Sequence, residues 1–213
     1  MAGLWEATML DGLPQGEFAA ILADPPWKFI VRSPKGEGRS PSQHYSVMPL
    51  PDIMALPVAS VAARSCHLFL WTSAPYLPLS LKVMEAWGFN YSSIAFTWLK
   101  TNPREAGALM LDARSFHVGL GLTTRKNTEI VLLGRRGNPK RLSGAVRELI
   151  IAPRREHSRK PDETFDRIGQ YCPGPYLEMF SRENRPGWTV AGNETGKFNG
   201  VAESAITQGR EAA

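Results

Sequence analysis

One short stretch of the chain combines a carboxylate, two prolines and an indole: Asp24, Pro25, Pro26 and Trp27. Asp24 and the carbonyl of Pro25 can accept the two hydrogens of an exocyclic amino group, and Trp27 or a neighbouring aromatic side chain can stack on the base that carries it. Acceptors on both hydrogens direct the lone pair of the amino nitrogen toward an electrophile. The stretch therefore predicts a catalytic site for chemistry on the amino group of a base. The alternative is a surface aspartate at an ordinary turn.

The residues before this stretch indicate how it is positioned. Residues 18–23 form an uninterrupted apolar run, which is too short for a typical helix and is typical of a buried strand. Two consecutive prolines cannot extend a sheet ladder or enter a helix interior, so the chain leaves the sheet at Pro25. Asp24 is then presented at the carboxyl end of a strand, where open α/β sheets bind their ligands.

Composition restricts the class of protein. With 213 residues, 43% hydrophobic and 21% charged, the chain has the balance of one soluble domain; we expect this domain to span residues 1–199, with a disordered tail over 200–213. No apolar run reaches membrane length, and no secretory signal is visible. Cys66 and Cys172 have neither metal-ligand spacing nor the number that a disulfide framework needs. We therefore expect a cytoplasmic protein without membrane association and without a metal site.

The net charge of +5 is distributed unevenly. Residues 135–160 hold nine basic side chains against Glu148 and Glu156, so this segment alone carries +7. The nine are Arg135, Arg136, Lys140, Arg141, Arg147, Arg154, Arg155, Arg159 and Lys160. A solvated surface explains many charge runs, but concentration of this degree favours a nucleic-acid partner. Most of these residues fall on two turns that follow apolar runs, and we expect both turns to rim the cleft that contains Asp24.

Apolar runs alternate with helical segments in the first half of the chain. The sequence predicts a helix over 51–63, a strand over 67–72, a helix over 76–87 that ends at Gly88, and a strand over 91–99. This alternation predicts an α/β fold with a mixed, mostly parallel sheet and helices on both faces.

The second half continues the pattern. Strands are predicted over 130–133, 149–152, 176–180 and 188–191. A helix is expected to begin at Pro161 and to bury Phe165, Ile168 and Cys172, and a basic turn is expected over 134–141. Residues 28–48 and 105–124 are long polar segments, and loops of this length in a compact domain are usually lids or binding loops.

Several motifs together resemble the MT-A70 family of adenine N6 methyltransferases. Asp-Pro-Pro-Trp at 24–27 is the signature, accompanied by Leu-Phe-Leu-Trp at 68–71, Lys-Thr-Asn at 100–102, Lys-Pro-Asp-Glu at 160–163 and Gly-Asn at 192–193. The likeness covers nearly the whole chain. It implies a Rossmann-like fold in permuted order, with the catalytic motif ahead of the residues that close the cofactor pocket. Such an order is consistent with the absence of a Gly-x-Gly-x-x-Gly motif after the first strand.

The resemblance implies S-adenosylmethionine as the cofactor. The residues that match the family's cofactor contacts are Glu6, Ala7, Asp24, Lys160, Glu178, Arg182, Asn184, Gly192, Asn193 and Glu194. Three of them depart from the commoner residue: Glu6 replaces aspartate, Asn184 stands where some relatives have histidine, and Glu194 stands where relatives often have glutamine. Lys160 has two candidate roles, as an anchor for the cofactor's carboxylate or as a phosphate contact, and we favour the first.

The candidates for substrate contact come from the resemblance and from the basic turns. They are Lys28, Tyr45, Trp71, Lys100, Asn102, Arg125, Glu129, Arg135 and Arg136. Tyr45 lies where the family has a gate loop over the substrate base. Glu129 is expected at the start of a strand, from which its carboxylate could reach the cleft.

The leading hypothesis is methyl transfer to the N6 amino group of adenine in nucleic acid. We favour DNA over RNA, because compact single-domain relatives are mostly microbial, and place cytosine N4 methylation third, because serine more often precedes the two prolines there. A non-catalytic nucleic-acid-binding subunit is the alternative from another class, and the family also allows a homodimer or a heterodimer with a related subunit. The presence of Asp24, Trp27, Lys160 and Asn193 argues against a non-catalytic chain.

Overall fold

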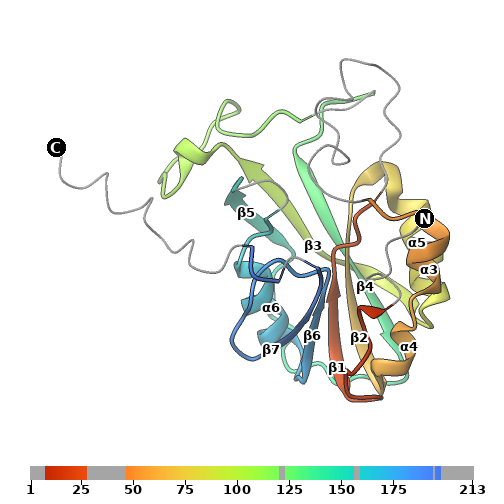
Figure 1. Cartoon of the computed structure of the whole chain (residues 1–213). Coiled ribbons are helices and arrows are strands. Elements are labelled where there is room, and N and C mark those ends of the chain that lie inside the picture. The colour runs from red at the N-terminus through yellow and green to blue at the C-terminus, as the bar shows by residue number, and fades with distance from the viewer. Residues whose placement is uncertain (1–7, 28–46, 120–122, 156–158, 194, 198–213) are drawn as a thin grey trace.

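The strand that precedes Asp24 lies inside a seven-stranded sheet. The structure, a computed structural model, describes residues 8–27, 47–119, 123–155, 159–193 and 195–197. In it β1 (Phe18–Ala23) has β2 on one side and β6 on the other, and the strand order is β5-β3-β4-β2-β1-β6-β7 (Figure 1). The remaining strands are β2 (Ala62–Thr72), β3 (Asn90–Thr101), β4 (Thr128–Arg136), β5 (Leu149–Pro153), β6 (Tyr176–Met179) and β7 (Trp188–Ala191).

Strand direction defines two ends of this sheet. β1 is parallel to β2 and β6, β6 is parallel to β7, and β3 is parallel to β5. Only β4 runs against its neighbours β2 and β3. We call the end at which the six parallel strands finish the carboxyl end, and the end at which they begin the amino end. β4 therefore starts at the carboxyl end, where Ile130 pairs with Thr72, and finishes at the amino end.

Helices cover both faces of the sheet. Figure 1 shows α3 (Leu50–Ala55), α4 (Val58–Val61) and α5 (Leu77–Ala86) on one side and α6 (Glu163–Tyr171) on the other. Each face has its own cluster of buried apolar side chains: Ile21 of β1 belongs to the cluster of the first three helices, and Ala20 and Leu22 belong to that of α6. Burial on both faces explains why residues 18–23 are apolar throughout rather than alternating. The predicted mixed, mostly parallel α/β fold is confirmed.

Two predicted elements have different bounds. The helix expected over 51–63 is interrupted at Leu56 and Pro57, because the residue before a proline is pushed out of the helical region; Leu56 has φ −58° and ψ 131°. β2 then begins at Ala62, five residues earlier than predicted. The basic turn expected over 134–141 begins later, because β4 continues through Arg136 and the chain turns at Gly137 with φ +63°.

Two smaller differences concern the last third of the chain. The helix expected from Pro161 begins at Glu163, and the strand expected over 176–180 stops at Met179 because Phe180 has φ +63°. The burial of Phe165, Ile168 and Cys172 is as predicted. The expected tail over 200–213 lies outside the described residues. In the described part of the chain, every helix is too short or too polar to cross a bilayer.

Candidate active site

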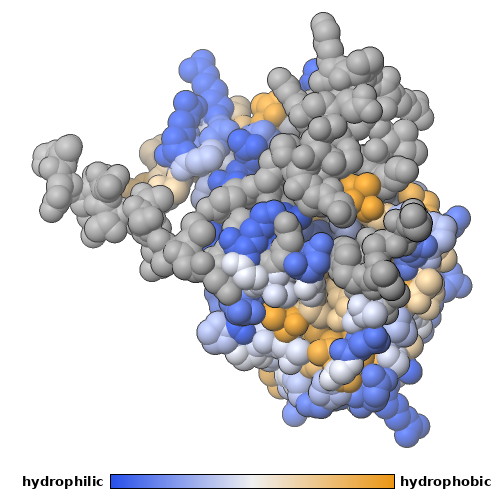
Figure 2. Space-filling model, in the orientation of Figure 1, coloured by the Kyte–Doolittle hydropathy of each residue, from blue (hydrophilic) through white to orange (hydrophobic). Residues whose placement is uncertain are grey.

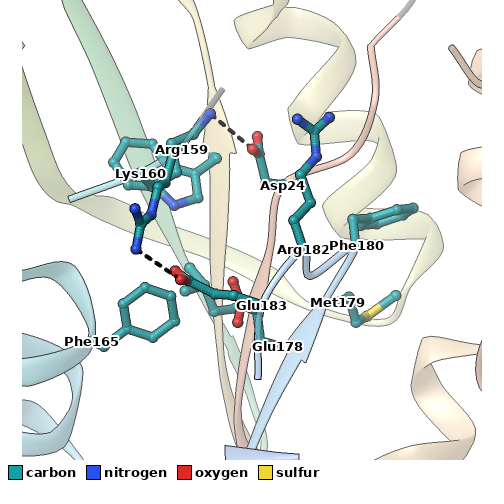
Figure 3. A pocket seen from close by; sticks show the side chains of 11 residues that line it. Asp24, Arg159, Lys160, Phe165, Glu178, Met179, Phe180, Arg182 and Glu183 are labelled. Atoms are coloured by element: carbon teal, nitrogen blue, oxygen red, sulfur yellow. Dashed lines mark hydrogen bonds and ion pairs between the residues drawn. The ribbon is translucent and has the colours of Figure 1, made fainter. Parts of the chain in front are cut away.

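A pocket opens at the carboxyl end of the sheet, where β1, β2 and β6 finish. Its empty volume is about 480 Å³, a figure that includes space open to solvent (Figure 3). The side chains that line it come from β1, β2, β6, α6 and the turns between them: Leu22, Asp24, Trp71, Arg159, Lys160, Phe165, Glu178, Met179, Phe180, Arg182 and Glu183. Carboxylates, cations and aromatic rings therefore surround one cavity.

A chain of four alternating charges starts at Asp24. The ammonium of Lys160 lies 2.8 Å from a carboxylate oxygen of Asp24 and 3.1 Å from one of Glu129. Glu129 also accepts a hydrogen bond from Lys100, at the end of β3. Lys160 lies 5.3 Å above the centre of the Trp71 ring, which adds a cation–π contact. Because β4 is antiparallel, its first residues bring Glu129 to the same end of the sheet as Asp24.

Burial and charge oppose each other in this chain. Burial raises the pKa of Asp24 above its ordinary value, with the ammonium of Lys160 opposing that rise. For Glu129 burial also raises the pKa, but Lys160 and Lys100 outweigh it and lower the value to about 2. Burial lowers the pKa of Lys160, yet Asp24 and Glu129 together raise it above its ordinary value. Lys160 and Glu129 are thus held in their charged forms beside Asp24.

Glu178 forms the floor of the pocket between β1 and the turn after β6. Burial raises the pKa of its carboxyl to about 7, although the hydroxyl of Ser181 donates to it at 2.9 Å. The same hydroxyl accepts a hydrogen bond from the amide of Glu183 at 3.4 Å, and the carbonyl oxygen of Glu183, at 2.8 Å, is the alternative acceptor for its hydrogen. The turn is therefore built around a partly buried carboxyl group whose pKa lies near neutral pH.

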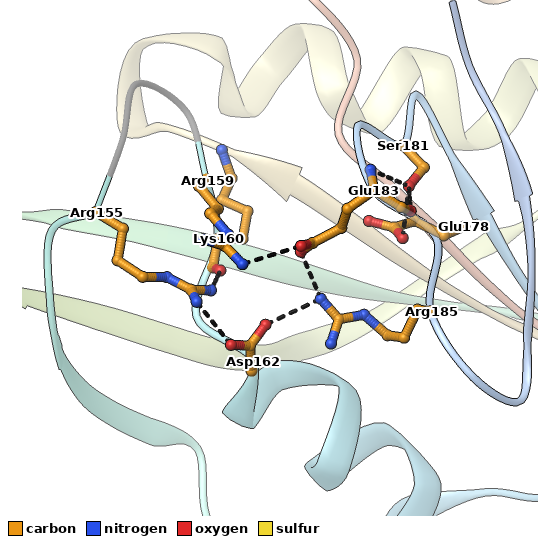
Figure 4. A network of polar contacts seen from close by, with 8 residues as sticks. All are labelled: Arg155, Arg159, Lys160, Asp162, Glu178, Ser181, Glu183 and Arg185. Atoms are coloured by element: carbon orange, nitrogen blue, oxygen red, sulfur yellow. Dashed lines mark hydrogen bonds and ion pairs between the residues drawn. The ribbon is translucent and has the colours of Figure 1, made fainter. Parts of the chain in front are cut away.

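A second ionic network fixes that turn against the start of α6 (Figure 4). Arg185 contacts Asp162 at 2.9 Å and Glu183 at 2.7 Å, Arg155 contacts Asp162 at 2.6 Å, and Arg159 contacts Glu183 at 3.0 Å. Arg185 also packs over the ring of Phe165, 3.6 Å from its centre. The side chains of the wall are thus preorganised by contacts to one another.

Gly192, after β7, lies directly against the same turn. A Cβ atom at this position would lie 2.4 Å from the carbonyl oxygen and 2.8 Å from the amide nitrogen of Ser181. Real Cβ atoms do not approach backbone so closely, so only glycine fits here. The approach holds the end of β7 beside the pocket wall.

Trp27 does not face the pocket. Its side chain is 6% exposed, stacks on Tyr76 with ring centres 5.9 Å apart, and donates from its indole nitrogen to the carbonyl of Trp71 at 3.3 Å. The expectation that its indole is presented to a base is therefore wrong, because the turn directs it into the core. Pro25 and Pro26 accept backbone hydrogen bonds from Trp27 and Met48 at 2.8 and 3.0 Å. The carbonyl of Pro25 keeps a second lone pair for another donor.

The other predicted site residues divide into three groups. Asp24, Trp71, Lys160, Glu178 and Arg182 line the pocket, and Lys100 and Glu129 join them through the ion pairs described above. A second group stands near the carboxyl end without lining the pocket: Asn102, whose amide donates to the carbonyl of Arg114, and the exposed Arg125, Asn184 and Asn193. The third group, which lies outside the described residues, is Glu6, Ala7, Lys28, Tyr45 and Glu194.

Arg135 and Arg136 lie at the other end of the sheet. They pair with His67 and Cys66 of β2, and His67 in turn pairs with Ala20 of β1, four residues before Asp24. The expectation that both basic turns rim one cleft is therefore wrong. Its physical reason is the reversed direction of β4, which carries Arg135, Arg136 and the turn that follows them to the end of the sheet away from the pocket.

Some pocket residues were not predicted. Glu183, Phe165 and Phe180 all line the cavity, with Leu22 and Met179 behind them. Glu183 is adjacent in sequence to the predicted Arg182, so the ends of the parallel strands were a sufficient signal for it. Arg159 was expected on the second basic turn, at the rim of this cleft, and it does line the cavity. Phe165 was assigned to a buried helix face, which the structure confirms, and nothing in its spacing indicated that the face also reaches a ligand site. In the described part of the chain, no three His, Cys, Asp or Glu side chains gather as they do around a metal ion.

Comparison with known proteins identifies the family. The MT-A70 family model matches residues 18–194. The chain is 32% identical over 203 residues to a Mycoplasma protein named type II methyltransferase M.MunI, covering 85% of this chain and 79% of that protein. It is 30% identical to the Drosophila melanogaster N(6)-adenosine-methyltransferase MT-A70-like protein and 29% identical to the human N(6)-adenosine-methyltransferase catalytic subunit METTL3. These two alignments cover 93% and 84% of this chain but only 30% and 28% of the two relatives. The chain belongs to the MT-A70 family.

Proposed function

We propose that this chain transfers the methyl group of S-adenosylmethionine to the N6 amino group of adenine in nucleic acid, with DNA as the favoured substrate. The observation that carries the proposal is the position of Asp24. Its carboxylate stands at the carboxyl end of β1, is anchored by Lys160 at 2.8 Å, and keeps 31% of its side chain exposed toward the pocket. An amino group that enters the pocket meets this acceptor directly.

The pocket residues fit S-adenosylmethionine. Its sulfonium and ammonium groups are positive, and the pocket wall contains the carboxylates of Asp24, Glu178 and Glu183. Ribose hydroxyls can donate to Glu178, a carboxylate can pair with Arg182, and the ring of Phe180 offers an apolar face to an adenine. The cofactor supplies a methyl group that is already activated by the positive sulfur.

The residues of the chain then have three tasks. Asp24 accepts one hydrogen of the amino group and the carbonyl of Pro25 accepts the other, which orients the nitrogen lone pair toward the methyl donor. Lys160 holds Asp24 in place and is itself held by Glu129. After transfer the amino nitrogen must lose a proton, and burial raises the pKa of Asp24, which makes this carboxylate a better proton acceptor. Trp27 fixes the turn through the hydrogen bond from its indole to the carbonyl of Trp71.

The choice of DNA rests on the comparisons. The chain spans 79% of the bacterial type II methyltransferase but less than a third of the eukaryotic adenosine methyltransferases. RNA is the second candidate, because those eukaryotic proteins match over most of this chain.

The test is transfer of a radiolabelled methyl group to DNA and RNA oligonucleotides of matched sequence, followed by digestion and separation of the nucleosides. The expected product is N6-methyladenine in DNA, with less or none in RNA. Oligonucleotides without adenine are the control and should take up no label. Label in cytosine, or label that is independent of adenine, would contradict the proposal.

A non-catalytic subunit remains the rival from another class. Such a chain would bind nucleic acid but neither hold the cofactor nor transfer methyl groups, so calorimetry with S-adenosylmethionine distinguishes the two.

The human relative is named a catalytic subunit. We therefore propose that this chain also associates, with a second copy or a related subunit, and that sedimentation with and without DNA reveals the assembly.

A further inference from the structure

The amino end of the sheet carries a group of cations far from the pocket. Arg135 and Arg136 finish β4, and Arg64 lies near the start of β2, the strand that pairs with β4. Lys140 and Arg141 follow in the segment after Gly137. We call these five residues the amino-end cluster. In the space-filling view, hydrophilic side chains dominate the lower rim of the molecule, where the amino end of the sheet lies (Figure 2).

Backbone contacts hold the segments that carry the cluster together at one end of the sheet. A Cβ atom on Gly137 would lie 2.4 Å from the carbonyl oxygen of Arg64, so the turn after β4 touches the start of β2. The amide of Asn138 donates to the hydroxyl of Ser65 at 3.2 Å. Further along, the amide of Leu142 donates to the carbonyl of Tyr171 at 2.8 Å, which ties the segment to the end of α6. The cluster therefore has a fixed scaffold.

The side chains of the cluster are available to a ligand. Arg64, Arg135, Lys140 and Arg141 are exposed, and Arg136 is half-buried with its guanidinium donating to the carbonyl of Ala59 at 2.6 Å. Within the described residues, none of the five forms an ion pair with a carboxylate, although Glu17 precedes β1 at the same end of the sheet. Around the pocket Lys160, Arg155 and Arg159 are instead paired with Asp24, Glu129, Asp162 or Glu183.

Cations that are mostly exposed, gather at one end of the sheet and form no ion pair within the described residues favour a polyanion. We propose that the amino-end cluster binds the phosphate backbone of the nucleic-acid substrate at a place remote from the target adenine. This inference rests on the proposed function, because it takes the polyanion to be the methylated nucleic acid itself. Contacts of this kind position a nucleic acid without reading its sequence.

Strand geometry sets the length of substrate that the cluster needs. Arg135 is six residues after Glu129 on β4, which corresponds to about 20 Å at the usual rise along a strand. A duplex advances by about 3.4 Å per base pair, so a substrate must extend at least about 6 base pairs beyond the target to reach the cluster. An oligonucleotide of about 4 nucleotides can enter the pocket but cannot touch both places.

The test uses a fourfold variant and two substrate lengths. The variant replaces Arg64, Arg135, Lys140 and Arg141 by glutamine and keeps Arg136, which bonds to Ala59. Binding is measured across salt concentration for a duplex of about 24 base pairs, and methyl transfer is measured on DNA of about 4 nucleotides. For the long duplex we expect the slope of log K against log salt to fall by about four and the affinity to fall at least about tenfold. Transfer to the short substrate should be unchanged.

Single substitutions provide the matched control. Arg135→Gln and Lys82→Gln each remove one exposed positive charge, but Lys82 lies on α5 outside the cluster. Only Arg135→Gln should lower the slope, by about one. Unfolding curves of all variants establish that the fold is intact.

Three results would overturn the inference. An unchanged slope in the folded fourfold variant means that the cluster is merely solvated. Equal losses on the short and long substrates mean that these residues act at the pocket. Loss of binding to anionic lipid vesicles, with DNA binding intact, assigns the surface to a membrane. If the wild-type chain transfers no methyl group to any nucleic acid, the proposed function fails, but the salt slope for the long duplex still decides whether the cluster binds phosphate.

Discussion

The two ends of the sheet use basic residues in different ways. At the carboxyl end Lys100, Lys160 and Arg159 contact carboxylates, and their charges fix side chains around the pocket. At the amino end the cations of the amino-end cluster form no ion pair within the described part of the chain, and most are exposed. The first arrangement preorganises a site for chemistry, whereas the second leaves charge available to a partner. Cations that are close in sequence therefore have different physical roles, decided by the direction of one strand.

The largest expected effect comes from removing Asp24. Asp24→Ala deletes the acceptor that orients the amino group, and loss of one such contact typically lowers the rate by about 10²–10³-fold. Lys160 keeps its contact with Glu129, so the fold should remain intact. Turnover and cofactor affinity are measured together, and the affinity is expected to change little. Asp52→Ala, on α3 and away from the pocket, is the control. Activity of Asp24→Ala within about threefold of wild type would contradict the assigned role.

The second-largest effect is expected from Lys160→Met, which removes the cation between two carboxylates at the carboxyl end. It leaves Asp24 and Glu129 facing each other without the ammonium between them, which is destabilising; because both carboxylates keep some exposure, we expect a loss of about 2 kcal/mol in unfolding free energy. The pKa of Asp24 should rise further, since Lys160 opposes its rise in the wild type. On acidification, activity that needs ionised Asp24 should therefore begin to fall at a higher pH in the variant than in the wild type. The pH–rate profile measures this, with Lys82→Met as the control; an unmoved acidic limb refutes the coupling.

Gly192→Ala should produce a structural effect at the pocket wall. The added Cβ would push on the backbone of Ser181, which we expect to cost about 1–3 kcal/mol and to weaken cofactor binding. Gly169→Ala is the matched control, because Gly169 lies within α6, where alanine is favoured, and its Cβ would make an ordinary 3.9 Å contact with the hydroxyl of Tyr176. Thermal unfolding and calorimetry distinguish the two variants. Equal behaviour of both would show that the approach of β7 to the turn is unimportant.

Glu178 makes a smaller, pH-dependent contribution. Burial raises its pKa to about 7 in the folded chain, above the ordinary value of 4.5, so the folded state holds a proton that the unfolded state releases. The stability of the wild type should therefore decline as pH rises from about 4.5 to about 7 on this account. In Glu178→Gln that component is absent, so the variant should become more stable relative to wild type by about 2 kcal/mol across this window. Unfolding at pH 5 and pH 8 tests it, with the exposed Glu85→Gln as the control. A stability difference that does not change with pH would contradict the assignment.

Much of the carboxyl end was predictable from the sequence. The apolar run before Asp24 and the two prolines after it fix a strand end, and parallel strands finish together, so Glu178 and Arg182 could be placed beside Asp24. Lys160 precedes a helix that follows β5, which brought it to the same end.

The amino end was not predictable by the same reasoning. An apolar run such as residues 130–133 gives a strand but not its direction, and among the strands of the described residues only β4 opposes its neighbours. The inward turn of Trp27 likewise depends on a packing partner, Tyr76, that lies far along the chain. Local patterns specify elements, whereas the direction of a strand and the orientation of an indole are decided by the tertiary core.

The most direct test of this division compares two variants in one pair of assays. Methyl transfer to DNA of about 4 nucleotides and the salt dependence of binding to a duplex of about 24 base pairs are measured for Asp24→Ala and for the fourfold variant of the amino-end cluster. We expect Asp24→Ala to lose transfer and to keep the wild-type salt slope. The fourfold variant should keep transfer of methyl groups to N6 of adenine and lose about four units of slope. If either variant loses both properties while remaining folded, or if Asp24→Ala still forms N6-methyladenine at the wild-type rate, the account is contradicted.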